Sequence, residues 1–184
     1  LGDLTAVDIF SGDLIWQLPT QSSDIINITY NFKNSRLVSD GKSIFFSNNK
    51  NEFFSVNLKN SSINWINNIS SSLTPILIDN LIITVSDNGY LFVVDKETGN
   101  IIKIKDIYKI NKDKKRKKKI KPIGFSISQD KIYISDNDGK LIILGLKTGN
   151  VLNVEKIARN IISKPFLYNN HLFMVKNGTV VQYE

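Results

Sequence analysis

The sequence contains no cysteine, one histidine, one methionine and only four prolines among its 184 residues. The missing cysteines exclude disulfides, thiolate metal sites and a thiol nucleophile. A single histidine forms neither a catalytic triad nor a metal cluster by itself, so we interpret His171 as a partly exposed turn residue. No apolar run reaches the roughly 18 residues that a membrane-spanning helix needs. Hydrophobic residues make up 41% of the chain, which is enough for one sizeable core.

Acidic residues are almost missing from one stretch, Lys109–Lys121, which holds nine of the 24 basic residues and one of the 17 acidic ones. Outside this stretch 15 basic and 16 acidic residues nearly cancel, so the net charge of +7 belongs to the run. Clustered lysines attract nucleic-acid phosphates or anionic lipid headgroups, whereas a solvated loop is the alternative interpretation. Aromatic residues for base stacking are nearly absent, so specific nucleic-acid binding is not expected. The candidate contacts with an anionic surface are Lys114, Lys115, Arg116, Lys117, Lys118 and Lys119.

One stretch, Ser86–Asn100, occurs in several recognisable copies along the chain. Within it, Asn88-Gly89 separates the apolar runs Leu81–Val85 and Tyr90–Val94, which predicts a β-hairpin with a two-residue turn. Asp95–Gly99 predicts a second turn, because Asp95 can accept backbone N–H bonds and Gly99 can adopt a positive φ.

The copies align over Val7–Trp16, Val56–Trp65, Val94–Lys103 and Leu144–Asn153. The position of Gly99 is filled by Gly12, Ser61 and Gly149 in the others, which gives spacings of 49, 38 and 50 residues. Cutting out the lysine-rich Lys109–Ile120 restores the shorter period. A repeat of about 40 residues with several short strands is typical of a β-propeller blade. Trp16 and Trp65 hold equivalent positions and are predicted to anchor one blade on the next, with Lys103 and Asn153 at that place in the other copies.

The predicted fold class is therefore all-β, a propeller of four-stranded antiparallel blades. Continuously apolar strands such as Leu91–Val94 and Leu141–Leu144 support this prediction, because both faces of a blade are covered by its neighbours. About four blades are expected here, as part of a seven- or eight-bladed ring whose half-rings could also pair as a homodimer. The expected organisation is a partial blade at 1–19, an insertion loop at 20–35, blades at 36–70 and 73–108, a basic loop at 109–121, a blade at 122–160 and a partial closing blade at 161–184.

The motif Asp8–Trp16, repeated without its tryptophan as Asp95–Lys103, resembles the blade motif of the pyrroloquinoline-quinone-type (PQQ-like) propeller family. Within it, three features are most similar to the BamB family, the propeller lipoproteins of the outer-membrane β-barrel assembly machinery. They are the C-terminal hairpin Asn170–Glu184, the pair Asp138–Leu141 and Thr148–Val151, and the long loop after Trp16.

This resemblance implies a non-enzymatic scaffold at the periplasmic face of the bacterial outer membrane, without a cofactor. Its implied partner is the set of periplasmic domains of the barrel-inserting subunit. We name Asp24, Ile26, Tyr30 and Phe32 as candidate partner-binding residues, with packing under their own loop as the alternative for the apolar ones.

A ligand-binding or quinoprotein-dehydrogenase-related module is the alternative function. The dehydrogenases of this superfamily share a vicinal cysteine pair, which this sequence lacks. Asp136–Gly139 resembles the opening of a calcium loop, but no liganding glutamate follows at the required distance, so a hairpin turn is predicted there.

Overall fold

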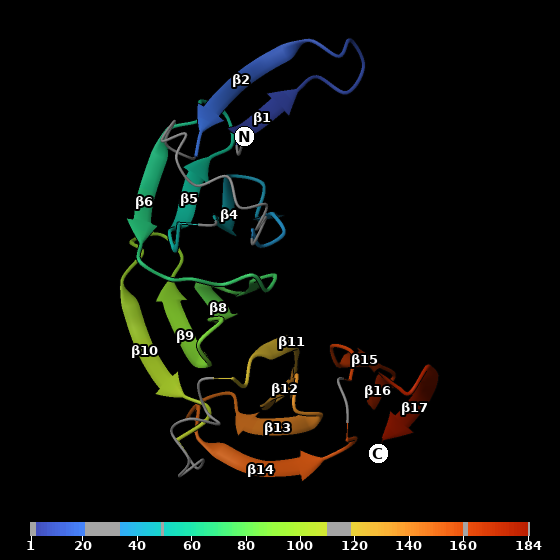
Figure 1. The fold of residues 1–184 in the computed structure, drawn as a ribbon. Coiled ribbons are helices and arrows are strands. Elements are labelled where there is room, and N and C mark those ends of the chain that lie inside the picture. Colours follow the sequence, from blue (N-terminus) through green and yellow to red (C-terminus); the bar gives the residue numbers. More distant parts are fainter. Residues whose placement is uncertain (1–2, 21–33, 49, 110–118, 160–161, 184) are drawn as a thin grey trace. The chain divides into compact units, whose positions relative to one another are not determined.

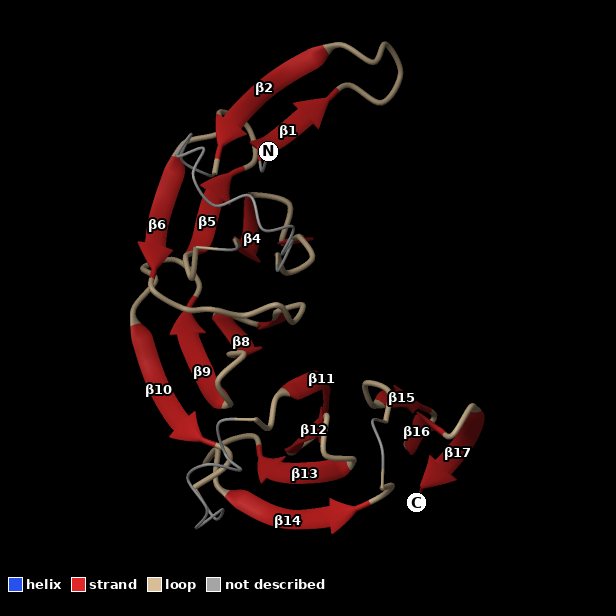
Figure 2. Cartoon of the chain, viewed as in Figure 1, coloured by secondary structure: helices blue, strands red, loops and turns tan. Residues whose placement is uncertain are grey.

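The computed structural model describes residues 3–20, 34–48, 50–109, 119–159 and 162–183. Every regular element within these ranges is a β-strand (Figure 2). No helix in the described residues is long and apolar enough to span a membrane. The chain forms two compact units, and each is described by itself. The first unit is residues 1–83 with 94–101, and the second is residues 84–93 with 102–184.

The strands form small sheets, and within each sheet neighbouring strands follow one another in the sequence (Figure 1). The first pair is β1 (Asp3–Val7) and β2 (Leu14–Pro19). A four-stranded sheet follows, made of β3 (Val38–Ser39), β4 (Ser43–Ser47), β5 (Phe53–Asn57) and β6 (Ile63–Asn67). The next has β7 (Ile76–Ile78), β8 (Leu81–Val85), β9 (Tyr90–Asp95) and β10 (Ile101–Asp106).

Two further sheets lie in the second unit. One is four-stranded and antiparallel, with β11 (Pro122–Ser128), β12 (Lys131–Asp136), β13 (Lys140–Gly145) and β14 (Val151–Lys156). The other has three antiparallel strands, β15 (Phe166–Tyr168), β16 (His171–Lys176) and β17 (Thr179–Tyr183). Repeated up-and-down sheets of four strands are blades, and the predicted all-β propeller fold is confirmed.

In the four-stranded sheets most of the core lies on the second and third strands. Phe53 and Val56 on β5, Ile82 on β8 and Leu144 on β13 have no exposed surface. These strands are covered on both faces, which explains their continuous apolar sequences. Burying each such side chain contributes about 1.5–3 kcal/mol to folding.

The hairpin turns differ in part from the prediction. At Ser86–Gly89 the turn has four residues between the strand ends, closed by a bond from Gly89 N to Ser86 O, and only Gly89 has a positive φ. The two-residue turn predicted at Asn88-Gly89 is therefore wrong, because the chain uses a longer turn ending in a left-handed glycine. The Asn177-Gly178 turn does have two residues, both with positive φ, between Lys176 and its partner Thr179.

Strand β1 ends at Val7. The Asp8 carboxylate accepts bonds from the N–H groups of Phe10 and Ser11, which turns the chain there.

Candidate functional site

The predicted partner-binding residues Asp24, Ile26, Tyr30 and Phe32 lie outside the described residues, and so do Lys114, Lys115, Arg116, Lys117 and Lys118. Of the basic contacts, only Lys119 is described, and it is exposed. The geometry of the site is therefore built from the residues that flank these stretches and from the contacts that hold the blades.

Both flanks of the basic run are fixed to the second unit. Before the run, Tyr108 is buried and its ring lies over Gly89, where an added Cβ would be only 2.3 Å from ring carbons. At the end of the run, the Asn137 side chain holds the backbone on both sides of Ile120. Its Nδ2 donates to the Lys119 carbonyl at 3.0 Å, and its Oδ1 accepts from Lys121 N at 2.8 Å. The described residues at both ends of the run are thus held in the fold of the second unit.

The structure corrects the predicted C-terminal end of the removable segment. The sequence suggests that Lys109–Ile120 can be cut out whole, yet Ile120 is buried at 5% exposure. Its apolar side chain belongs to the core and the adjacent Lys119 carbonyl is hydrogen-bonded, so a cut through Ile120 removes part of the fold.

The predicted tryptophan anchors are confirmed as contacts between consecutive sheets. Trp16 Nε1 on β2 donates to Leu58 O at 2.9 Å, just after β5. Trp65 Nε1 on β6 donates to Lys96 O at 3.0 Å, just after β9. At the equivalent place on β10, the Lys103 ammonium donates to Lys147 O in the turn after β13. In each case, therefore, a side chain on the last strand of one sheet donates to a main-chain carbonyl in the turn after the third strand of the next sheet.

The equivalent residue Asn153 on β14 behaves differently. Its Nδ2 donates to Glu155 Oε1 on the same strand, at 2.7 Å. The donor that joins consecutive sheets is thus a tryptophan on β2 and β6 and a lysine on β10. The equivalent residue on β14 bonds within its own strand.

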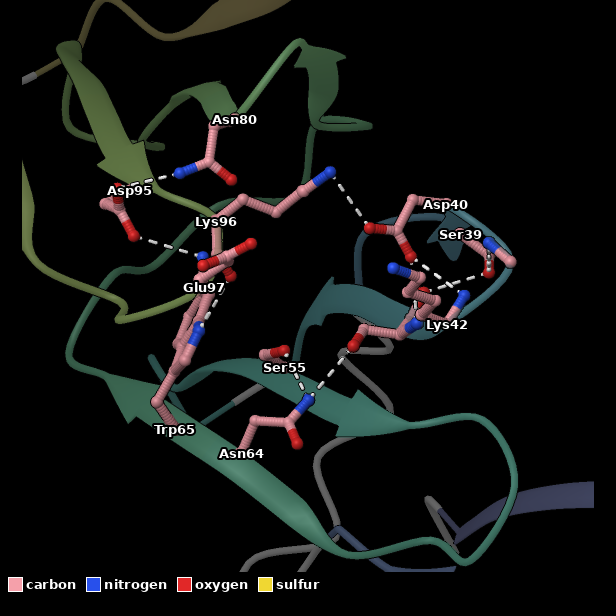
Figure 3. A network of polar contacts seen from close by, with 12 residues as sticks. Ser39, Asp40, Lys42, Ser55, Asn64, Trp65, Asn80, Asp95, Lys96 and Glu97 are labelled. Atoms are coloured by element: carbon pink, nitrogen blue, oxygen red, sulfur yellow. Dashed lines mark hydrogen bonds and ion pairs between the residues drawn. The ribbon is translucent and has the colours of Figure 1, made fainter.

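The turn that receives Trp65 is the centre of a polar network in the first unit (Figure 3). Asp95 Oδ1 accepts from Glu97 N at 3.1 Å and from Thr98 N at 2.8 Å, while Asn80 Nδ2 donates to Asp95 Oδ2 at 3.1 Å. The N–H and the hydroxyl of Thr98, and then the N–H of Glu97, lower the pKa of Asp95. Lys96 joins this turn to the preceding sheet twice, because its carbonyl accepts from Trp65 and its ammonium pairs with Asp40 at 3.0 Å.

Asp40 receives several donors in the β3–β4 turn. Partial burial opposes its ionisation, but the N–H groups of Ser43 and Lys42 and the Lys96 ammonium outweigh burial and lower its pKa to about 2. Sequence analysis did not find this pair, because Asp40 and Lys96 are far apart in the chain and each looks like an ordinary turn residue.

We expect Asp40→Asn to lower the free energy of unfolding by about 1–2 kcal/mol at neutral pH. The folded pKa lies below the unfolded value of 3.8, so this contribution is present above pH 3.8 and is lost as the pH falls through about 2. Urea unfolding over this pH range checks it, with Lys96→Met and the double variant completing a cycle. Additive effects of the two substitutions would contradict the ion pair.

Strand β12 ends in a buried carboxylate. Asp136 has no exposed surface, and its Oδ1 accepts from Asp138 N and Lys140 N, both at 2.9 Å. Among the described residues, neither Asp136 Oδ2 nor Tyr108 Oη has a hydrogen-bond partner. Burial raises the pKa of Asp136 and that of the Tyr108 hydroxyl, and the charge of Asp136 raises the latter further.

Asp138 and His171, which were weighed as metal-binding or catalytic candidates, both lie in β-hairpins. Asp138 pairs with Lys140 at 3.2 Å and with Lys156 at 3.5 Å, in a hairpin turn as predicted. His171 was predicted to be a partly exposed turn residue, but it is the first residue of strand β16 and pairs with Tyr168. It is partly exposed as predicted, with its ring edge-on to Phe173. Within the described ranges, no three His, Cys, Asp or Glu side chains come together in a metal-binding group.

Taken together, the described polar groups hold turns and join sheets. Tyr108 and Asn137, which fix the flanks of the basic run, were not singled out as functional by sequence analysis. Asn137 carries a weak signal, since it precedes the turn dipeptide Asp138-Gly139, but its bonds to Lys119 and Lys121 depend on the fold.

The fold and the sequence were compared with known proteins. Solved structures similar to the chain include BamB from Moraxella catarrhalis, with a TM-score of 0.67, 11% identity and 99% of this chain covered. The Cps50 (Swd1) β-propeller domain from Myceliophteria thermophila has a TM-score of 0.67 and 13% identity, with 96% of this chain and 56% of that chain covered. The computationally designed Ika4 protein gives 0.62 and 12%, covering 81% of this chain and 91% of that chain.

At these identities the structural likeness establishes the propeller fold alone. The chain spans about half, 52%, of the Moraxella protein. No curated protein matches the sequence significantly. A family model described as outer membrane protein assembly factor BamB matches residues 1–105, which is more than half of the chain. The chain therefore belongs to the BamB family of PQQ-like propeller proteins.

Proposed function

We propose that the chain acts as a non-enzymatic protein-interaction scaffold in outer-membrane β-barrel assembly. The observation that carries this proposal is the match of the BamB family model to residues 1–105. The likeness to the Moraxella BamB structure over 99% of the chain supports it, because the blades continue beyond the matched residues.

The architecture suits a scaffold. Consecutive sheets are fastened by side chains that bond to the main chain of the next turn, as Trp16 and Trp65 do. Sheets fixed in this way hold their connecting loops in place, and loops on a rigid framework are where binding residues concentrate. The acidic turn residues Asp40 and Asp95 accept backbone N–H bonds and thus serve the framework.

In this proposal the site of action is the periplasmic face of the outer membrane, and the partner is the set of periplasmic domains of the barrel-inserting subunit. The intact protein is a ring of seven or eight blades. The contact is made by the insertion between β2 and β3, through Asp24, Ile26, Tyr30 and Phe32.

Titration calorimetry with the periplasmic domains of the same organism's barrel-inserting subunit tests the proposal. The wild-type chain is expected to bind, and Tyr30→Ala with Phe32→Ala is expected to weaken binding at least tenfold, as aromatic contacts at an interface centre do. The matched control is Phe166→Ala with Tyr168→Ala, which removes two exposed aromatic side chains of β15. Absence of binding by the wild-type chain would refute the scaffold role, whereas equal binding by both double variants would refute the assigned contact.

A further inference from the structure

Charge is divided unequally between the two units. The second unit has 18 Lys and Arg residues against 8 Asp and Glu, a net charge of +10. The first unit has 6 against 9, a net charge of −3. Outside the run Lys109–Lys121 the second unit still has 9 basic and 7 acidic residues. Most of the positive charge of this unit therefore belongs to the run, and a small excess remains in the sheets.

Several of these lysines gather at one turn, between β12 and β13. Asn137 in that turn holds the backbone of Lys119 and Lys121, and both lysines are exposed. Asp138 pairs with Lys140 and Lys156, and the Lys156 ammonium also donates to the Asp138 carbonyl. Two carboxylates, Asp136 and Asp138, thus lie beside four lysines, Lys119, Lys121, Lys140 and Lys156, so positive charge remains in excess at this turn.

Strand β14 adds exposed apolar surface beside this charge. Leu152, Val154 and Lys156 alternate along β14 and so lie on one face of the strand. Leu152 is 59% exposed and Val154 is 39% exposed, while the Lys156 side chain is 45% exposed. Strand β14 is an edge strand of its sheet (Figure 1). Its face with Leu152, Val154 and Lys156 is apolar at the start of the strand and basic at the end.

We propose that the turn between β12 and β13, together with this face of β14, binds the surface of a membrane rich in anionic phospholipid. Here we call it the basic face, made of Lys119, Lys121, Lys140, Lys156, Leu152 and Val154. Lysines near such a surface are attracted by its negative potential, and exposed apolar side chains enter the boundary between headgroups and acyl chains.

A membrane fits the basic face better than a nucleic acid does. The nearby Tyr108 is buried, so it offers no platform for a base. The second unit has only two arginines, Arg116 and Arg159, although arginine is the residue preferred for bidentate contacts with phosphates and bases. Exposed Leu152 and Val154 have no role in binding a phosphate backbone, whereas they contribute to contact with lipid.

Vesicle co-sedimentation tests the basic face. The full chain is mixed with vesicles of phosphatidylcholine alone, or with about one third phosphatidylglycerol, at low and at physiological salt. We expect binding to the anionic vesicles only, weaker at the higher salt. The triple variant Lys119→Gln, Lys121→Gln, Lys156→Gln is expected to bind at least tenfold more weakly. The double variant Leu152→Ser, Val154→Ser is expected to weaken the part of the vesicle binding that remains at physiological salt, because that part depends on apolar contact with lipid.

The matched control neutralises three exposed lysines of the first unit, Lys42, Lys50 and Lys59, by the same substitution to glutamine. It changes the net charge equally, so an equal loss in both triple variants would overturn the basic face in favour of overall charge. Tighter binding to a fluorescent oligonucleotide than to the anionic vesicles would overturn the lipid assignment. Unchanged thermal melting of each variant confirms that it is folded. No partner protein is present, so failure here is separate from failure of the scaffold proposal.

Discussion

Gly99→Val is expected to lower the free energy of unfolding by about 3 kcal/mol, with two causes of similar size. Gly99 has a φ of +75°, which a β-branched residue adopts only with strain. A Cβ at this position would also lie 2.7 Å from Trp65 Cγ and Cδ2, so the indole ring would have to move. Because Trp65 stacks on Phe53 and donates to Lys96 O, moving the ring disturbs both neighbouring sheets. Urea unfolding followed by tryptophan fluorescence measures the effect.

Gly149→Val provides the matched control, because Gly149 has the same place in its repeat and a φ of +67°. Its nearest neighbours are carbons of Lys105, at 3.0 Å, and Lys103, at 3.4 Å. Lysine chains move aside more easily than an indole ring, so this variant is expected to cost about 1–2 kcal/mol, mainly the backbone strain. Equal losses at the two positions would contradict the role given to Trp65.

Asp136→Asn is expected to raise the free energy of unfolding by about 1–3 kcal/mol at neutral pH. Asparagine keeps the Oδ1 acceptor for Asp138 N and Lys140 N and removes a buried charge. The chain already has an asparagine in an equivalent position after β4. Asn48 Oδ1 accepts from Lys50 N and Glu52 N, the second and fourth residues after it, as Asp136 Oδ1 does from Asp138 N and Lys140 N. Asn48 Nδ2 donates to Thr20 O. Unfolding of the wild type and the variant in urea at several pH values measures the gain.

The pH dependence of this gain has a defined sign. Burial raises the folded pKa of Asp136 above the unfolded value of 3.8. The contribution of Asp136 to the stability of the wild type is therefore most favourable below pH 3.8 and declines as the pH rises through the folded pKa, while the asparagine variant shows no such decline. The variant's advantage should close as the pH falls toward 3.8. Asp95→Asn is the control of opposite sign, because the pKa of Asp95 is lowered, and it should destabilise the protein at neutral pH.

The repeat made the fold predictable from the sequence. Glycines at the same place in successive copies specify turns that need positive φ, and Gly12, Gly99 and Gly149 all have it. Ser61 has a φ of 57° at the equivalent place, so the repeat holds even where the glycine is replaced. The tryptophan anchors were predictable for the same reason, because Trp16 and Trp65 recur at one position of an aligned motif.

The finer contacts could not be predicted, because they join residues that no local pattern connects. Lys96 carries nothing in its sequence neighbourhood that marks Asp40 as its partner, and Tyr108 shows no sign that its ring will lie over Gly89. The predicted turn length was wrong at Ser86–Gly89. The dipeptide Asn88-Gly89 is compatible with a two-residue turn and with a longer one, and the positions at which the strands end decide between them. The candidate partner residues were chosen from an insertion without periodicity, and they stay a prediction.

The bonds between consecutive sheets have an evolutionary consequence, because each acceptor is a main-chain carbonyl. Leu58, Lys96 and Lys147 accept through the peptide group, so their own side chains are not specified by the contact. The donor has changed from Trp65 to Lys103 without a compensating substitution opposite it. Blades that join in this way can be duplicated, exchanged or altered one at a time, and paired substitutions across the joint should be rare among homologues. Such joints allow the sequence of each blade to diverge while the fold is kept, in agreement with the 11–13% identities to propellers of the same architecture.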